Sequence, residues 1–186
     1  MRKFMISVLM ITLLLPAGCG EREARMEEDF EAFRAAITVT EMLALRAELT
    51  ALGDGTAAEY VLDTVYDGSA VTVTVAEPTL LAGVTAVAAR GETELSYEGV
   101  RLGLGPVDGE GLTPVSAIPA MIDAMQSGYL ELLWREAPYL VARVHVGEGT
   151  VMTLWLEEQT LTPAAAELAS GGKTVITCRF SGWTMA

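Results

Sequence analysis

The chain has 186 residues, of which 51% are hydrophobic and 20% charged, a balance typical of folded rather than disordered proteins. Its formal net charge of −13 at pH 7 argues against nucleic-acid binding, because the electrostatic attraction to phosphates would have the wrong sign. With two cysteines and one histidine, the chain also has too few ligands for a zinc-finger framework or an iron–sulfur cluster.

Residues 1–18 predict a secretory signal peptide. Arg2 and Lys3 precede the apolar stretch Phe4–Leu15, which is too short for a helix that spans about 30 Å of hydrocarbon. The mature protein is therefore expected outside the cytoplasm.

The end of this leader resembles a bacterial lipobox. Ala17 and Gly18 stand directly before Cys19, with Pro16 at the position where leucine is usual. The resemblance implies cleavage before Cys19 and a covalent diacylglycerol and acyl anchor on that residue, which would hold the protein to the cell membrane. An ordinary secretory leader that leaves Cys19 free is the alternative. With Cys19 lipidated, Cys178 has no partner for an intramolecular disulfide.

The mature chain begins with a charged segment, 19–26, that predicts a short solvated tether to a single domain over 27–186. Between Met26 and Ile37, apolar residues recur at helical spacing and predict an amphipathic helix. The next stretch, Glu41–Leu49, fits a helix by composition and a strand by alternation. The turn residues that follow it favour the strand.

Short alternating segments predict a large antiparallel sheet. The expected strands are Glu59–Tyr66, Ala70–Ala76, Val84–Ala89, Glu94–Tyr97, Val100–Leu104, Tyr129–Trp134, Tyr139–Val146, Val151–Glu157 and Thr174–Phe180. Pro163–Ser170 lies between the last two, and a second helix is expected over about Val115–Gly128. Two helices cannot cover the apolar face of so many strands if the sheet is strongly curved, so we expect an apolar groove.

Three segments, in this order and spacing, resemble one protein family: Val73–Val84, Glu94–Val100 and Leu112–Pro119. Together they look like LolA/LolB-like lipoprotein carriers, closest to the GerS-like germination lipoproteins of spore-forming Gram-positive bacteria, over most of residues 27–182. The resemblance implies an α+β fold, an incomplete antiparallel β-barrel with helices on its concave side. In the carriers this side shelters acyl chains, whereas the germination lipoproteins bind a cell-wall amidase.

The same resemblance implies a role for Leu80 and Leu81. In the anchored outer-membrane carrier, a loop with an exposed leucine follows a strand and a proline, and these two leucines follow Pro78. A loop that folds back onto the core is the alternative.

The candidate ligand-binding residues comprise these two leucines and apolar positions expected on the concave face. They are Leu80, Leu81, Val73, Val75, Ile118, Met121, Ile122, Met125 and Trp155. Plain core packing explains the helical methionines equally well.

Catalytic and metal-binding patterns are not found. The single histidine, His145, alternates with Arg143 on the polar side of a strand, which favours a solvated or hydrogen-bonded side chain. Cys178 is expected to be a quiet, partly buried residue. No nucleophile, base and orienting group can be named together, so we expect no enzyme activity, no metal and no cofactor beyond the lipid anchor.

Two functions follow as expectations. The first is a membrane-anchored envelope lipoprotein that binds a lipid, a lipoprotein acyl chain or an apolar peptide in the concave face of its sheet. The second is a GerS-like scaffold whose interior is filled by its own side chains and whose surface docks a cell-wall amidase of the spore cortex.

Overall fold

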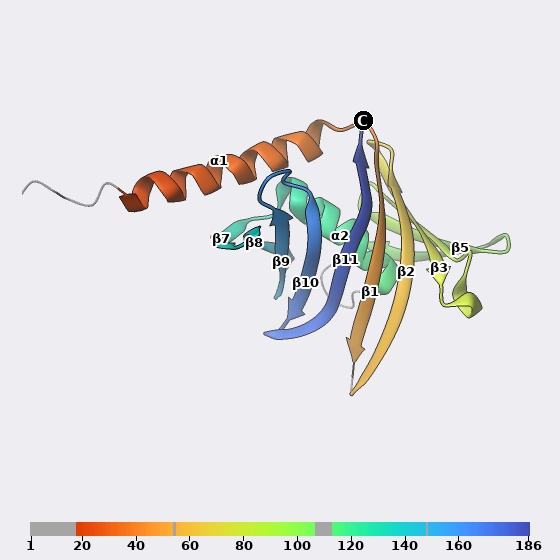
Figure 1. Cartoon of the computed structure of the whole chain (residues 1–186). Helices are drawn as coiled ribbons and strands as arrows, with labels where there is room; N and C mark the ends of the chain where they lie inside the picture. Colours follow the sequence, from red (N-terminus) through yellow and green to blue (C-terminus); the bar gives the residue numbers. More distant parts are fainter. Residues whose placement is uncertain (1–17, 54, 107–112, 148) are drawn as a thin grey trace, which may run out of the picture.

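The structure is a computed structural model that describes residues 18–53, 55–106, 113–147 and 149–186 (Figure 1). In chain order the elements are α1 (Gly18–Val39), β1 (Leu43–Gly53), β2 (Thr56–Tyr66), β3 (Ala70–Glu77), the short 3₁₀ helix η1 (Thr79–Leu81), β4 (Thr85–Ala89), β5 (Glu92–Tyr97), β6 (Val100–Pro106), α2 (Pro114–Ser127), β7 (Leu130–Glu136), β8 (Tyr139–Gly147), β9 (Thr150–Glu157), β10 (Pro163–Ser170) and β11 (Lys173–Met185).

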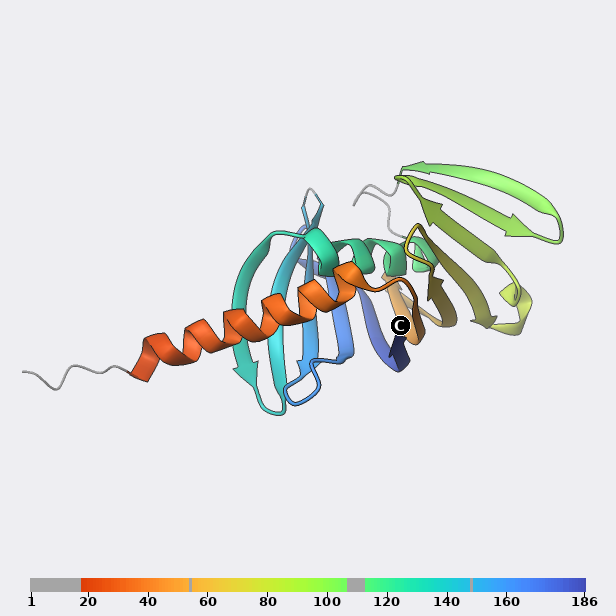
Figure 2. The same ribbon diagram turned by 90° about the horizontal axis from the view of Figure 1, so that it is seen from above.

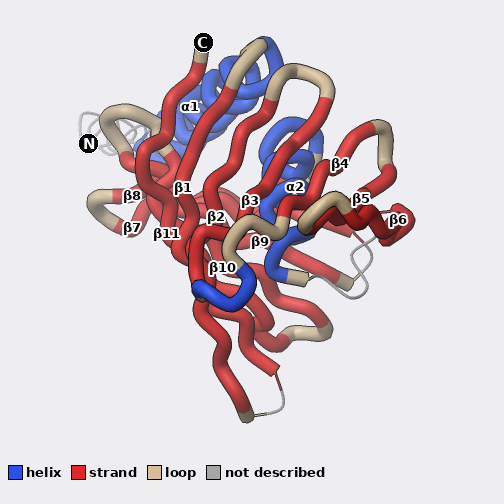
Figure 3. Tube along the Cα trace, turned by 90° about the vertical axis from the view of Figure 1, so that its right-hand side faces the viewer, coloured by secondary structure: helices blue, strands red, loops and turns tan. Residues whose placement is uncertain are grey.

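The described strands form one eleven-stranded sheet in the order β6-β5-β4-β3-β2-β1-β11-β10-β9-β8-β7. All neighbours are antiparallel, so the sheet consists of two meanders joined where β1 pairs with β11. The sheet is strongly bent and does not close, because β6 and β7 remain its two edges (Figure 3). This arrangement confirms the expected α+β fold with an incomplete antiparallel barrel.

Alternation along each strand decides which side chains enter the core. In β3, Val71, Val73 and Val75 are buried, whereas the intervening Thr72 and Thr74 are only partly covered. The same period runs through β9, so one face of the sheet is apolar throughout its centre. Both long helices lie on this concave face (Figure 2).

Helix α2 is positioned by its ends. Thr113 and Ser116 form a capping box, in which the backbone N–H of each residue donates to the hydroxyl of the other, and Pro114 occupies the first turn. At the other end, the Arg34 guanidinium of α1 donates to the carbonyls of Met125 (3.3 Å) and Gly128 (2.6 Å). Arg34 therefore fastens α1 to the C-terminal end of α2.

Helix α1 lies beside α2 and covers the β7 side of the concave face. Phe30, Phe33 and Ile37 recur at helical spacing and are buried, as the sequence predicts. The helix is nevertheless longer than expected, because it also includes the predicted tether, 19–26, and its N-terminal half extends beyond the strands (Figures 1 and 2). The predicted signal peptide lies outside the described residues except for Gly18, as does the side chain of Cys19.

Most predicted strands are confirmed within one or two residues. The segment Glu41–Leu49, for which composition alone was ambiguous, is also a strand, but β1 ends four residues later than expected, and β2 and β11 are likewise longer at one end. Pro163–Ser170 forms β10, an interior strand between β9 and β11. None of the helices in the described ranges is long and apolar enough to cross a bilayer.

Candidate functional site

Six of the predicted ligand-binding residues lie together between α2 and the sheet. All six are buried in the main core, where α2 packs against β3, β4 and β8; they are Val73, Val75, Ile118, Met121, Ile122 and Met125. Their side chains therefore fill the centre of the concave face. Ligand binding by this set stays a prediction.

Trp155 lies on the other face of the sheet. Its neighbours Leu154 and Leu156 are buried toward the helices, and a side chain between them points outward. There it stands opposite Val141, which is fully buried although it lies outside the main core. The structure therefore does not bring Trp155 together with the six concave residues. The sequence interpretation was wrong here, because it assigned Trp155 to the concave face of β9 and not to the outer face.

Leu80 and Leu81 occupy η1, which lies apart from α1 and α2 (Figures 1 and 2). Leu80 is 87% exposed and Leu81 38%, so the loop does not fold back onto the core. It follows the C-terminal end of β3, whereas the cavity described next adjoins the N-terminal end. A functional role for the two leucines stays a prediction.

A cavity of about 330 Å³ opens between α2 and the strands β3 and β4. Its buried wall is apolar and consists of Val71, Pro119, Ala120 and Ile122. Half-buried Ala70, Ala88, Ala89 and Val146 continue this wall outward. The exposed lining residues are mostly polar or charged and include Ser69, Arg90, Glu92 and Asp123. The cavity thus changes from apolar inside to charged at its exposed rim.

Only Ile122 of the predicted residues lines this cavity. The space exists because small side chains meet there: alanines of β4 stand across from Pro119 and Ala120 of α2. The signal in the sequence was the alanine-rich segment Thr85–Ala89, in which a strand presents little volume to the helix. The predicted site residues are large and apolar, and large side chains fill space. A cavity forms where the side chains are small, so the prediction did not include its lining.

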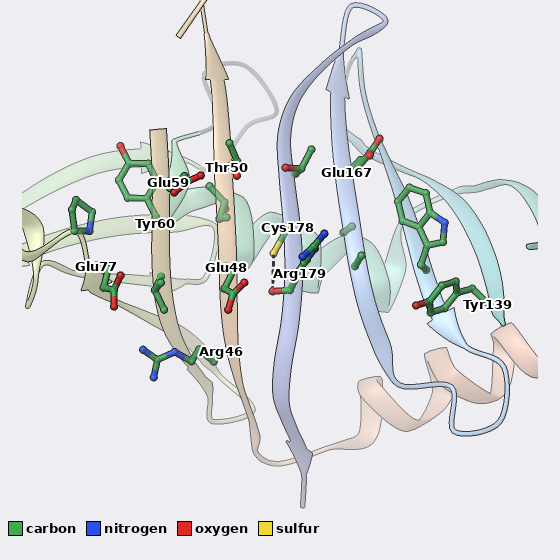
Figure 4. A pocket seen from close by; sticks show the side chains of 17 residues that line it. Arg46, Glu48, Thr50, Glu59, Tyr60, Glu77, Tyr139, Glu167, Cys178 and Arg179 are labelled. Atoms are coloured by element: carbon green, nitrogen blue, oxygen red, sulfur yellow. Dashed lines mark hydrogen bonds between the residues drawn. The ribbon is translucent and has the colours of Figure 1, made fainter. Parts of the chain in front are cut away.

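A second, larger hollow of about 1000 Å³ lies on the outer face of the sheet, away from both helices (Figure 4). Its lining is mixed: charges of both signs come from Arg46, Glu48, Glu59, Glu77, Glu167 and Arg179, and aromatic side chains from Tyr60, Tyr139 and Trp155. Arg46 pairs with Asp63 at 3.5 Å. Such a surface suits a polar ligand or a protein, and not an acyl chain.

Comparison with known proteins places the fold. No protein-family model matches the sequence, and no curated protein matches it. Among solved structures, a LolA superfamily protein from Nitrosomonas europaea covers 87% of this chain and 93% of its own, with 13% identity and a TM-score of 0.54. The chain has a LolA-like fold.

A second solved structure agrees with this assignment of the fold. A domain from Vibrio parahaemolyticus named for outer membrane lipoprotein sorting covers 89% of this chain and 92% of its own, with 8% identity and a TM-score of 0.51. The GerS lipoprotein of Clostridioides difficile, solved in complex with the CwlD amidase, has 15% identity over 85% of this chain and 94% of that chain. The TM-score of this match is 0.46.

The single histidine of this LolA-like chain lies on the outer face near the β7 edge. His145 Nε2 lies 3.2 Å from a carboxylate oxygen of Glu131, and the Arg143 guanidinium lies 3.3 Å from the same oxygen. The imidazole also packs beside the Tyr129 ring. The side chain is 43% exposed, in agreement with the prediction of a solvated or hydrogen-bonded histidine. Within the described ranges, no group of three or more His, Cys, Asp or Glu residues is placed to hold a metal ion.

Cys178 is buried on the core side of β11, as a free thiol. Burial raises the pKa of this thiol to about 12, and the negative charge of Glu48 contributes to the same rise. The uncharged thiol is therefore a poor nucleophile at neutral pH, which agrees with the predicted quiet role.

Proposed function

We propose that this chain is a non-enzymatic envelope lipoprotein, anchored to a membrane through Cys19, that takes one acyl chain of an amphipathic ligand into the cavity between α2 and β3–β4. The observation that carries the proposal is the change in the lining of this cavity. Its interior is formed by Val71, Ala120 and Ile122, whereas Arg90, Glu92 and Asp123 stand at its exposed rim. An apolar tail with a polar head matches both parts.

The size of the cavity supports a single chain. A volume of about 330 Å³ is at the lower end of the range of roughly 300–1,000 Å³ typical of ligand pockets. Each buried methylene contributes about 0.8 kcal/mol, so a tail of about eight methylenes contributes roughly 6 kcal/mol before the costs of binding are subtracted. This is sufficient for reversible binding, as a carrier requires.

Filling the cavity tests the proposal. Ala88 lies on the cavity side of β4, and the adjacent Val87 points to the other face, opposite Thr72 of β3. Ala88→Phe should therefore weaken binding of cis-parinaric acid, a fluorescent fatty acid, whereas Val87→Phe serves as the matched control. Losing room for two methylenes costs about 1.6 kcal/mol, or roughly tenfold in affinity.

The measurement is a fluorescence titration of the purified chain, with circular dichroism to verify that both variants fold. Tighter binding by the parent and Val87→Phe than by Ala88→Phe supports the proposal. Equal binding by all three, or no binding by the parent, contradicts it.

A second candidate is a scaffold for a cell-wall amidase, favoured by the outer hollow. Four carboxylates from Glu48, Glu59, Glu77 and Glu167 line it, and the chain carries a net charge of −13, which suits a basic partner. A chain that binds no fatty acid but retains a purified amidase at low salt would support the scaffold over the carrier.

A further inference from the structure

The two edges of the sheet are protected to different degrees. At the β7 edge, Arg135 pairs with Asp29 of α1 and with Glu158, so a helix and charged side chains stand beside the strand. At the other edge, β5 is the one described strand that pairs with β6. Val100 is 71% exposed and Leu102 59%, and the β5–β6 hairpin projects from the body of the protein (Figure 2). An edge strand presents unpaired N–H and C=O groups, which are a template for pairing with another strand.

The hairpin turn determines which backbone groups of β6 are free. Glu98 and Gly99 both have positive φ, 48° and 84°, and form a two-residue turn closed by Tyr97 and Val100. In such a hairpin the closing pair is hydrogen-bonded, and so is the second pair beyond it, Leu95 with Leu102. The N–H and C=O groups of Arg101 and Gly103 therefore point away from β5, toward the free edge.

We propose that β6 pairs antiparallel with β6 of a second copy of this chain, across a two-fold axis at Leu102. In this register Arg101 stands opposite Gly103 of the second copy. Because both residues direct their backbone groups outward, the two symmetric pairs together form four hydrogen bonds. Leu102 then meets Leu102 of the second copy in a non-hydrogen-bonded pair with Cα atoms about 4.5 Å apart. The two sheets would continue as one.

The side chains of the outer face fit the same register. Within one copy, Arg101 pairs with Glu94 at 3.4 Å, and Glu94 stands opposite Gly103. Across the axis, Arg101 lies next to Gly103 of the second copy, with Glu94 of the second copy directly behind. Gly103 has no side chain, so the guanidinium can reach over it to that carboxylate. Each copy supplies one such cation, which locally opposes the repulsion between two acidic proteins.

This self-complementarity is the reason to favour a second copy over an unrelated peptide. Strand β6 supplies the free backbone groups, the arginine and the glycine that leaves room for it, and the paired strand β5 supplies the carboxylate behind. A two-fold axis matches each of these features with its partner. The contact is short and falls below the roughly 800 Å² per partner of a standard interface, so the dimer should be weak and concentration-dependent.

Disulfide trapping tests the pairing directly. A Cα separation of about 4.5 Å allows a disulfide, so Leu102→Cys should cross-link to its counterpart in the full chain under mild oxidation. Leu132→Cys is the matched control, because Leu132 is 54% exposed on the other edge strand, β7. We expect at least about fivefold more covalent dimer on a non-reducing gel for Leu102→Cys than for the control. Cys19 and Cys178 are common to both variants.

A charge exchange makes the test specific for the register. In the Leu102→Cys background, Arg101→Glu should lower the yield of dimer about threefold, and adding Glu94→Arg should restore it. Equal cross-linking by Leu102→Cys and Leu132→Cys would overturn the proposal. A yield that Arg101→Glu leaves unchanged would overturn the register, and cross-linking of Leu102→Cys only to another protein would overturn the identity of the partner.

Discussion

Gly128 joins α2 to β7 where the backbone leaves no space for a side chain. A Cβ atom at this position would lie 2.5 Å from Val144 Cγ1, 2.6 Å from the His145 carbonyl oxygen and 2.7 Å from the Ala124 carbonyl oxygen. Its φ of −62° is ordinary, so the restriction is steric and not conformational. The Arg34 guanidinium binds the carbonyl of the same residue, which places Gly128 at the junction of both helices and the sheet.

We therefore expect Gly128→Ala to lower the free energy of unfolding by about 1–3 kcal/mol, as other overpacked sites do. Gly53→Ala is the control, because no described atom lies within 4 Å of the place that its Cβ would take and its φ is not positive. Urea denaturation of both variants measures the difference. Equal stability of the two would contradict the packing around Gly128.

Cys178 predicts a dependence of stability on alkaline pH. The pKa of its thiol rises from 9.0 to about 12 on folding, because burial disfavours the thiolate. The folded protein thus holds this proton more tightly than the unfolded chain. Its contribution is fully present below about pH 9 and is lost as the pH approaches 12, by up to about 4 kcal/mol.

Cys178→Ala removes this titration. We expect its unfolding free energy, relative to that of the parent, to improve progressively as the pH rises above 9. Thermal unfolding between pH 7 and pH 11 measures the difference, and a gap between the two proteins that stays constant with pH would refute the assignment. Other titrating groups are common to both proteins and cancel.

Residue by residue, the sequence predicted burial better than it predicted the site. Val73, Val75 and Met121 were expected on the concave face and lie there. Trp155 was expected with them because it is large and apolar, although Leu154 and Leu156 set the opposite phase. The cavity lining was missed for a related reason, since the space depends on small residues such as Ala88 that no pattern of large side chains reveals.

At the scale of elements, one arginine links the two long helices. Arg34 donates to two carbonyls at the end of α2, and its guanidinium also lies 4.8 Å from the centre of the Phe30 ring. Gln126 adds a reciprocal contact, because its side-chain amide donates to the Ile37 carbonyl. These bonds satisfy carbonyls that the last turn of a helix otherwise leaves unpaired.

Arg34→Met keeps most of the apolar stem and removes these hydrogen bonds. We expect a loss of about 1.5–3 kcal/mol in unfolding free energy, because the donor is charged. Hydrogen exchange should also speed up in the segment around Phe30–Ile37 more than in the strands. Arg25→Met, on the exposed part of the same helix, is the control. Unchanged exchange in the Arg34→Met variant would show that α1 is held by its apolar face alone.

The elements that the sequence missed share a cause. Pro163–Ser170 contains four alanines and one leucine, a composition with weak strand propensity, yet it forms β10 because both of its neighbours pair with it. The charged segment 19–26 was expected to be a tether, yet it continues α1, since glutamate, arginine and alanine are good helix formers. For β10, pairing with two neighbouring strands outweighed the weak strand propensity of the segment. For 19–26, continuation of a long helix outweighed the expectation from its high charge.

For the whole molecule, alternation predicted one large curved sheet with helices inside it, and this is what the structure shows. The order of the strands could not be predicted in the same way. Pairing of β1 with β11 joins residues near the two ends of the domain, as between Leu43 and Met185, and no local pattern specifies a contact over that distance. That pairing connects the two meanders and completes the core between them.

The pairing of β1 with β11 bears on how an exported chain would fold. If the protein leaves the cytoplasm as an unfolded thread, β1 emerges early and lacks its second neighbour until β11 has followed. Each meander can fold as it emerges, but β1 and β11 cannot pair before nearly the entire polypeptide has been translocated. For a chain exported in this way, the topology would delay complete folding until translocation is almost finished.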